Sequence, residues 1–326
     1  MNSESTDDIP VFHGRRHRRT FEKLIAEAEK STETVSYAVV WPCDSHALAG
    51  AVVAAKRGII RPILIGDIGR IREVAQCSGI ETDGIDMLEA RDPGEAAKLA
   101  VKAVHSGHAH GIMKGSIHTD ILMHEIVDPE NGLLTTRRMS HVYLLTVPGY
   151  KDVIFITDAA VNISPDLAAK RDIVQNAIDL HHGLGLGVPR VALLSAIETV
   201  NPRVLGTVDA AALCKMAERG QIKGALLDGP LAMDNAIDKS AARIKGIVSK
   251  VAGHAQILVA PDLEAGNMLA KSLIFMAHAD SAGVVLGAKV PILLTSRADN
   301  VVARLTSAAV GSLYSAYLQK TNHIEN

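Results

Sequence analysis

The sequence predicts an α/β protein of two domains, in which mainly parallel sheets are flanked by helices. Apolar residues make up 48% of the 326-residue chain but aromatic residues only 3%. The core therefore consists mainly of Ala, Val, Ile and Leu, which is typical of helices covering a buried parallel sheet. Short aliphatic runs also alternate with helix-like segments, and this pattern requires crossover connections between parallel strands. A chain of this length usually forms two compact units, and we expect a cleft between them.

Ten short runs of β-branched or aliphatic residues predict strands. Most of them are separated by segments with helical composition, which favours repeated strand and helix units. The predicted strands are residues 37–41, 62–66, 111–113, 142–147, 153–157, 191–194, 225–227, 257–260, 283–286 and 291–294.

Capping residues indicate where the helices begin and end. We expect Ser164 to cap a helix that has Pro165 in its first turn and ends at Gly183. Thr207 and Gly220 bracket another helix in the same way.

A last helical pattern runs from residue 299 to about residue 319. We expect this helix to return to the first domain, which makes that domain discontinuous. The predicted organisation is a flexible N-terminus at residues 1–18, domain I at residues 19–150 and 284–326, and domain II at residues 151–283.

Charge and cysteine usage narrow the classes of partner and compartment. The chain has 34 basic and 36 acidic residues, and its net charge of −2 gives no field that would attract nucleic acid or an anionic membrane. We therefore expect a small-molecule partner. The three cysteines, Cys43, Cys77 and Cys214, fit neither a disulfide framework nor a structural zinc site, and they suit a reducing cytoplasm. The first residues lack the apolar stretch of a signal peptide, and Lys289 interrupts the longest apolar region, so we expect no membrane span.

Polar residues gather where predicted strands end. In parallel sheets, ligands bind beyond the carboxyl ends of the strands, because loops and helix N-termini offer unpaired N–H groups there. We expect polar residues at these positions to line one cleft. The five polar junctions are residues 113–119, 157–162, 228–235, 261–267 and 295–299.

Two cations at these junctions indicate an anion site. Lys114 and Arg297 follow predicted strands and stand beside Ser, Gly and Thr donors, as a phosphate site requires. Arg297 also precedes a helical pattern, where its charge opposes the helix dipole unless an anion compensates. Helix capping is the alternative explanation for each of Asp158, Asp228 and Asp262 taken alone.

Several other signals carry less weight. His105, His108 and His110 are possible metal ligands, but no nearby Cys or carboxylate completes a set, and the stretch HSGHAHG is typical of a helix end. We therefore predict no metal site. The sequence contains neither a G-x-S-x-G motif nor a P-loop, which disfavours serine hydrolases and common nucleotidases.

Four long motifs occur in order along the second half of the chain. They are FITDAAVNISPD at residues 155–166, LLDGPLAMDNAI at 226–237, VAPDLEAGNMLAKSL at 259–273 and GAKVPILLTSRAD at 287–299. Through them, from about residue 111 to residue 304, the chain resembles the phosphate acetyltransferase and phosphate butyryltransferase family. DGPLAMDNAI and TSRAD are closer to the butyryl branch, and to the transferase module fused to enoyl-CoA hydratases, than to the classical acetyltransferases.

The resemblance implies a fold like that of the isocitrate and isopropylmalate dehydrogenases, usually dimeric. It also implies an enzyme that reversibly transfers an acetyl or butyryl group between coenzyme A (CoA) and inorganic phosphate. Transfer would take place in a ternary complex, without a covalent acyl-enzyme and without a tightly bound cofactor, since CoA is a substrate that enters the cleft between the domains.

The site residues follow from the same resemblance. Ser296 and Arg297 occupy the Ser-Arg motif of the family, where the arginine holds phosphate and stabilises the tetrahedral oxyanion. The catalytic aspartate of the acetyl enzymes has no clear counterpart, and Asp299 is the nearest carboxylate. The residues expected to bind phosphate or CoA are Lys114, Gly115, Ser116, His118, Thr119, Asp158, Glu264, Gly266 and Asn267.

Two other classes of function stay open at the level of sequence. A dehydrogenase of the same architecture would need clustered aspartates for a divalent metal, and no such cluster is visible in the sequence. A non-catalytic acyl-CoA-binding protein would bind acyl-CoA but show no phosphate-dependent release of CoA.

Overall fold

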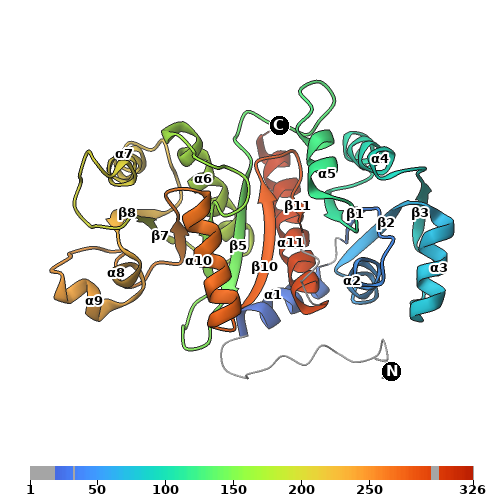
Figure 1. Ribbon diagram of the computed structural model, residues 1–326, viewed down its shortest axis with the longest axis horizontal. Helices are drawn as coiled ribbons and strands as arrows, with labels where there is room; N and C mark the ends of the chain where they lie inside the picture. Colours follow the sequence, from blue (N-terminus) through green and yellow to red (C-terminus); the bar gives the residue numbers. More distant parts are fainter. Residues whose placement is uncertain (1–18, 32–33, 295–300, 326) are drawn as a thin grey trace. The chain divides into compact units, whose positions relative to one another are not determined.

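The computed structural model describes residues 19–31, 34–294 and 301–325. The expected flexible N-terminus and the motif residues Ser296, Arg297 and Asp299 lie outside these described residues. The fold is α/β, with helices flanking β-sheet (Figure 1). It divides into two compact units, of which unit 1 comprises the described residues up to Thr136 and from Ala282 onward, and unit 2 runs from Arg137 to Ser281.

Unit 1 contains a sheet with strand order β3-β2-β1-β4-β11-β10. β3, β2, β1, β4 and β11 are parallel to one another, and β10 is antiparallel to β11. The strands are β1 (Val35–Val40), β2 (Ile60–Gly66), β3 (Asp86–Glu89), β4 (Gly111–Lys114), β10 (Asp280–Leu286) and β11 (Ile292–Leu293). The helices are α1 (Arg19–Lys30), α2 (Ser45–Lys56), α3 (Ile68–Ser78), α4 (Pro93–His105), α5 (Thr119–Ile126) and α11 (Val301–Glu325).

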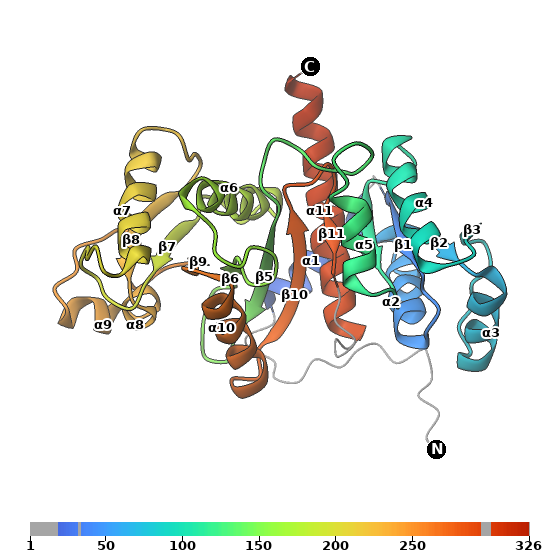
Figure 2. The same cartoon turned by 45° about the horizontal axis from the view of Figure 1, so that its top comes forward.

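The helices of unit 1 cover both faces of its sheet. α11 packs on β1, β2, β4 and β11 and contacts α1 and α2, as Figure 2 shows for the long C-terminal helix. α2 and α3 lie on crossovers that move outward from β1 to β3, whereas α4 returns the chain from β3 to β4. Because such crossovers are right-handed, α4 lies on the opposite face.

The buried ring of Tyr37 in β1 requires glycine at two positions of unit 1. Its side chain is fully buried, and its hydroxyl lies 3.0 Å from Ser315 Oγ of α11. A Cβ at Gly111 of β4 would lie 2.2 Å from the Tyr37 ring, and one at Gly311 of α11 would lie 2.6 Å from its hydroxyl. Only glycine leaves room for the ring at both positions, so this packing fixes α11 on the sheet.

Unit 2 contains a sheet with strand order β5-β6-β9-β7-β8. β6, β9, β7 and β8 are parallel, and β5 is antiparallel to β6. The strands are β5 (Ser140–Thr146), β6 (Ile154–Thr157), β7 (Arg190–Leu194), β8 (Leu226–Leu231) and β9 (Ile257–Val259). The helices are α6 (Leu167–Gly183), α7 (Leu205–Glu218), α8 (Met233–Ile237), α9 (Lys239–Ile244) and α10 (Leu263–Met276).

Aspartates begin most of the capped helices. Asp44, Asp67, Asp92, Asp166 and Asp262 are the N-caps of α2, α3, α4, α6 and α10, and each carboxylate accepts the N–H three residues further on. The predicted start of α6 at Ser164 and Pro165 is therefore wrong by two residues, because Asp166 makes the capping bond. Its predicted end at Gly183 is confirmed.

Thr207 does not cap α7, which begins at Leu205. Its buried hydroxyl instead donates to Val204 O at 2.7 Å and accepts from Asn201 N at 2.8 Å, so it closes the preceding turn. Gly220 follows the helix with a φ of 74°, as a glycine after a helix end commonly does.

The predicted strands are present, with shifted ends, and one further strand was missed. β3 has mostly exposed residues and lies at the edge of its sheet, so it lacks the apolar run that marks a buried strand. β8 extends to Leu231, whereas the sequence predicted an end at residue 227. β8 also lies at a sheet edge, where Pro230 is tolerated because it removes no central ladder bond. Asp228 therefore lies within a strand and not at a strand end.

Candidate active site

The carboxyl ends of four parallel strands meet at one edge of the unit 1 sheet. β1 ends at Val40, β2 at Gly66, β4 at Lys114 and β11 at Leu293. Lys114 is only 6% exposed, although its ammonium group carries charge. Its Nζ donates to the carbonyl oxygen of Gly115 at 3.4 Å. A buried cation at this edge is suited to binding an anion.

The loop after β4 is bound to the loop after β1. Gly115 N donates to Val40 O at 2.9 Å, and Ser116 N donates to Trp41 O at 2.9 Å. Ser116 Oγ donates to Trp41 O at 2.7 Å and accepts from Cys43 N at 3.1 Å. A Cβ at Gly115 would lie 2.5 Å from Val40 O, so this approach of two backbones requires glycine. Gly115 and Ser116 therefore hold the two loops together.

α5 begins at the same edge. His118 occupies the N-cap position but makes no side-chain capping bond, and the side chains of His118 and Thr119 are exposed. The N-terminal N–H groups of a helix carry partial positive charge and favour an anion. His118 and Thr119 are therefore placed where an anion could contact the start of α5.

The residues after β1 were not singled out from the sequence. Trp41 is buried with a left-handed φ of 56°, which is unusual for a bulky residue, and Cys43 is buried beside it. Burial raises the pKa of the Cys43 thiol to about 11, so this cysteine is a thiol and not a thiolate nucleophile at neutral pH. The sequence WPCD carried the same signal as the other junctions, since polar residues follow an aliphatic run.

In unit 2, the carboxylate of Asp158 follows β6 and is 3% exposed. It accepts N–H bonds from His141 at 3.1 Å, Ala160 at 3.1 Å, Val161 at 3.2 Å and Asn162 at 2.9 Å. The side-chain amide of Asn162 donates to it as well. Both oxygens are thus directed at the loop that follows β6, and the carboxylate fixes the shape of that loop.

His141 stands beside this carboxylate on β5. Its Nδ1 is buried and has no hydrogen-bond partner among the described residues. Burial lowers the pKa of His141 to about 4, although the negative charge of Asp158 acts in the opposite direction. The imidazole is therefore neutral at physiological pH.

α10 is packed closely against the same loop. A Cβ at Gly266 would lie 2.3 Å from the Asp158 carbonyl oxygen, and Asn267 Nδ2 donates to Ala159 O at 2.9 Å. Asp262 caps α10 through a 2.8 Å bond from Ala265 N, which is the alternative role that the sequence left open for it. Glu264 is exposed in the first turn of α10. Gly266 and Asn267 thus hold the loop against the helix.

Other strand ends of unit 2 also carry polar groups. Ser195 Oγ and Asn235 Oδ1 are buried without a hydrogen-bond partner among the described residues. Asn235 Nδ2 donates to Glu198 at 2.6 Å, and Lys245 forms an ion pair with the same carboxylate. None of these residues was predicted as a site residue. Only Asn235 belongs to a polar junction expected from the sequence, at residues 228–235.

Comparison with known proteins identifies the family. The family model described as phosphate acetyl/butaryl transferase matches residues 84–311. A phosphate acetyltransferase of Rhizobium meliloti is 57% identical over 296 residues, which cover 91% of this chain and 93% of that protein. The chain belongs to the phosphate acetyl/butaryl transferase family.

Two further relatives support this placement in the phosphate acetyl/butaryl transferase family. A phosphate butyryltransferase of Clostridium beijerinckii is 38% identical over 298 residues, covering 91% of this chain and 98% of that protein. The crystal structure of a branched-chain phosphotransacylase from Enterococcus faecalis V583 superposes with a TM-score of 0.75 at 28% identity, covering 86% of this chain and 99% of that one. The resemblance predicted from the four motifs is therefore confirmed.

The site residues predicted from the sequence fall into three groups in the structure. Lys114, Gly115, Ser116, His118 and Thr119 lie together at one edge of unit 1. In unit 2, Asp158 and Asn267 bind the loop after β6, Gly266 packs against it, and Glu264 lies one turn away on α10. Ser296, Arg297 and Asp299 lie outside the described residues.

The described residues also bear on metal and membrane binding. They contain no group of three or more His, Cys, Asp and Glu side chains arranged to hold a metal ion. No helix in the described part of the chain is long and apolar enough to cross a membrane.

Proposed function

We propose that this protein is a phosphate acyltransferase that moves an acetyl group between CoA and inorganic phosphate. The observation that carries the proposal is the 57% identity to a protein named phosphate acetyltransferase, extending over nine-tenths of both chains. A butyryl group is the second choice, because a relative named phosphate butyryltransferase matches the chain over a similar length at lower identity.

We propose that Arg297, Ser296 and Lys114 hold the phosphate group of the acyl phosphate. The CoA thiol gives its proton to a carboxylate, for which Asp299 is the candidate. The thiolate sulfur then forms a bond to the acyl carbonyl carbon, and the C–O bond to phosphate breaks, so that inorganic phosphate leaves with the electron pair. The reverse reaction makes acyl phosphate and CoA. Orientation of two bound substrates and stabilisation of the oxyanion by cations supply the acceleration.

The geometry of unit 1 supports the role of Lys114. Lys114 is nearly buried at a strand end, on the sheet edge where ligands bind in parallel sheets. We propose that His118, Thr119 and the first N–H groups of α5 contact the same phosphate or the CoA diphosphate. Gly115 and Ser116 act through the loop that they hold, since the hydroxyl proton of Ser116 is already donated to Trp41.

The residues of unit 2 are proposed to bind substrate mainly through the loop after β6. Asp158, Gly266 and Asn267 set the position of that loop, and the exposed carboxylate of Glu264 borders it.

The finer features of the enzyme are proposals as well. We propose a cytoplasmic homodimer with the isocitrate and isopropylmalate dehydrogenase architecture, in which units 1 and 2 are the two folding domains. CoA is a substrate, and no tightly bound cofactor takes part. An apolar strip on α10 supports the homodimer, since Met268, Phe275 and Met276 are 63%, 68% and 81% exposed on one helix.

A thiol-release assay tests the function. Purified protein is mixed with phosphate and a panel of acyl-CoA substrates from acetyl-CoA to branched and longer chains, and free CoA is measured. We expect phosphate-dependent release that is fastest with acetyl-CoA. Release that is fastest with butyryl-CoA would correct the acyl group, and binding of acyl-CoA without release by any member of the panel would refute the transferase assignment.

A further inference from the structure

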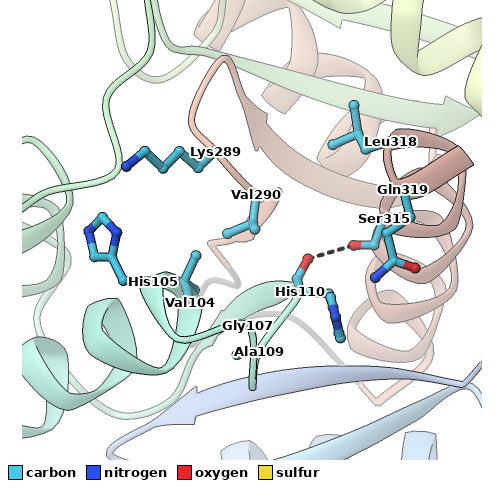
Figure 3. Close-up of a pocket in the computed structure, with 10 residues that line it drawn as sticks. All are labelled: Val104, His105, Gly107, Ala109, His110, Lys289, Val290, Ser315, Leu318 and Gln319. Atoms are coloured by element: carbon cyan, nitrogen blue, oxygen red, sulfur yellow. Dashed lines mark hydrogen bonds between the residues drawn. The ribbon is translucent and has the colours of Figure 1, made fainter. Parts of the chain in front are cut away.

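Unit 1 has a pocket at the amino end of β4, opposite the edge that carries Lys114. Its volume is about 340 Å³, which lies within the usual range for small-molecule sites. Three segments form its walls, namely the end of α4 with the following loop, the turn between β10 and β11, and the last turns of α11 (Figure 3). β4 is four residues long, so the pocket and the Lys114 edge are separated by about 10 Å of strand.

The charged groups of the pocket favour an anion. Among the ten described residues that line it, none is acidic, whereas Lys289, His105 and His110 are basic. Lys289 N donates to Leu133 O at 2.9 Å, which fixes the turn. No carboxylate in the described part of the chain forms an ion pair with the Lys289 ammonium group, which is therefore open to a ligand.

The two histidines differ in which nitrogen carries a proton. His105 Nε2 lies 3.0 Å from Asn131 O, so it donates to that carbonyl, and Nδ1 is an acceptor in the neutral ring. His110 Nδ1 accepts the backbone N–H of Ser36 at 3.4 Å, so its proton is on Nε2, which is a donor. The guanidinium group of Arg61 donates to Ser36 Oγ at 2.8 Å and adds positive potential beside His110.

The space between these polar groups is apolar. Val104, Val290 and Leu318 line the pocket and are each partly exposed. Figure 3 draws the side chains of Lys289 and His105 on one side of Val290, and those of His110 and Gln319 on the other. A ligand that fills the pocket therefore needs a negative group at one end and a hydrocarbon part beside it.

We propose that this pocket binds a small aliphatic carboxylate, with the carboxylate at the ammonium group of Lys289 and the hydrocarbon chain against Val104, Val290 and Leu318. The site is separate from the proposed transfer site, and it does not depend on the transferase assignment. A carboxylate fits this set because it accepts hydrogen bonds from the ammonium group while its chain covers the apolar wall.

The test is a methyl NMR titration of the full chain, labelled at Ile, Leu and Val methyl groups, with sodium butyrate. We expect saturable shifts at the methyl groups of Val104, Val290 and Leu318, with a dissociation constant on the order of 1 mM for so small a ligand. Shifts of these three methyl-bearing residues report binding in the pocket and not binding of butyrate at the transfer site. The cation n-butylammonium, which has a similar chain, should not shift them.

Two matched variants test whether the charge of Lys289 binds butyrate. Lys289→Met should weaken butyrate binding by about two- to fivefold, the range expected for an exposed charged pair. Lys271→Met removes the same charge from exposed α10 of unit 2 and should leave binding unchanged. Absence of pocket shifts throughout the millimolar range, equal shifts with n-butylammonium, or an unchanged dissociation constant in Lys289→Met would each overturn the proposal.

Discussion

The hydroxyl of Ser116 donates a 2.7 Å hydrogen bond to the carbonyl oxygen of Trp41 and accepts one from Cys43 N. Ser116 therefore joins the loops that follow β4 and β1. A serine beside Lys114 was expected to bind phosphate, and the structure shows that its only hydroxyl proton is already used within the protein. Its contribution to a ligand site is then mainly to position the loop.

Ser116→Ala should lower the free energy of unfolding by about 1–3 kcal/mol, because the Cys43 N–H loses its partner in a partly buried loop. The Michaelis constant for phosphate should change by less than about threefold, since loss of a direct charged hydrogen bond would cost more. Urea unfolding and initial rates measure both quantities. Ser78→Ala, at an exposed position in α3, is the control. Unchanged stability together with a much higher Michaelis constant would show direct binding instead.

Gly266→Ala should destabilise the protein by about 1–3 kcal/mol or more, as overpacking does, because the new Cβ would lie 2.3 Å from the Asp158 carbonyl oxygen. The gain of helix propensity, about 1 kcal/mol, is too small to offset the clash. Urea unfolding measures the change. Gly69→Ala is the matched control on α3, since its Cβ would meet only the Asp67 carboxylate at 3.3 Å. Equal stability of the two variants would contradict the close packing of α10.

Arg297→Ala should reduce turnover by about a hundredfold or more, by analogy with loss of an oxyanion donor. This prediction depends on the Ser-Arg motif, because Arg297 lies outside the described residues. The thiol-release assay measures the effect, and Arg72→Ala, at an exposed position in α3, controls for loss of a positive charge. Near-normal turnover would remove Arg297 from the proposed mechanism.

The buried histidine His181 should make stability depend on pH. Its Nδ1 donates to Gly187 O, its Nε2 has no partner among the described residues, and burial lowers its pKa to about 4. The unfolded chain binds a proton near pH 6.5 but the folded chain only near pH 4, so stability is full above pH 6.5 and falls as the pH drops toward 4. The slope is at most about 1.4 kcal/mol per pH unit.

His181→Asn should reduce that slope, because the amide keeps a donor for Gly187 O and does not titrate. Urea unfolding between pH 7 and pH 5 gives the slope of unfolding free energy against pH for each protein. The slopes of the original protein and His181→Asn should differ by on the order of 1 kcal/mol per pH unit. His46→Asn removes an exposed histidine of α2 and should retain the original slope. A slope that is the same in all three proteins would show that His181 is not the titrating group.

Phe275→Asp should dissociate the proposed homodimer, because it places a charge in the apolar strip of α10. Sedimentation should show twice the 34.6 kDa chain mass for the original protein and a single chain for the variant. Ile244→Asp, at an 83% exposed position of α9, controls for charge added to an exposed apolar residue. A monomeric original protein, or a variant that stays dimeric, would refute this interface.

The sequence alone determined the α/β class, the positions of the buried strands and the family. Aliphatic runs mark strands such as β4 because a buried strand is apolar on both faces, and they placed Lys114 at a strand end. The same rule failed for β3, which is exposed at an edge, and for β8, whose Gly229 and Pro230 resemble a turn. They instead lie at a register irregularity within β8, between residues that pair with β7. Strand pairing is a long-range interaction, and local composition does not record it.

The tertiary structure decided what the polar residues at the strand ends contact. The sequence shows a hydroxyl at Ser116 and a carboxylate at Asp158, but not whether they face a ligand or the backbone. In the folded chain the Ser116 hydroxyl bonds backbone groups of the loop after β1, which is distant in sequence. The Asp158 carboxylate accepts N–H groups of its own loop and of His141 on β5, because buried backbone groups must find partners. Lys114 is likewise placed by the fold, which buries it at the sheet edge where ligands bind in parallel sheets. These positions depend on contacts between strands and loops, which only folding brings together.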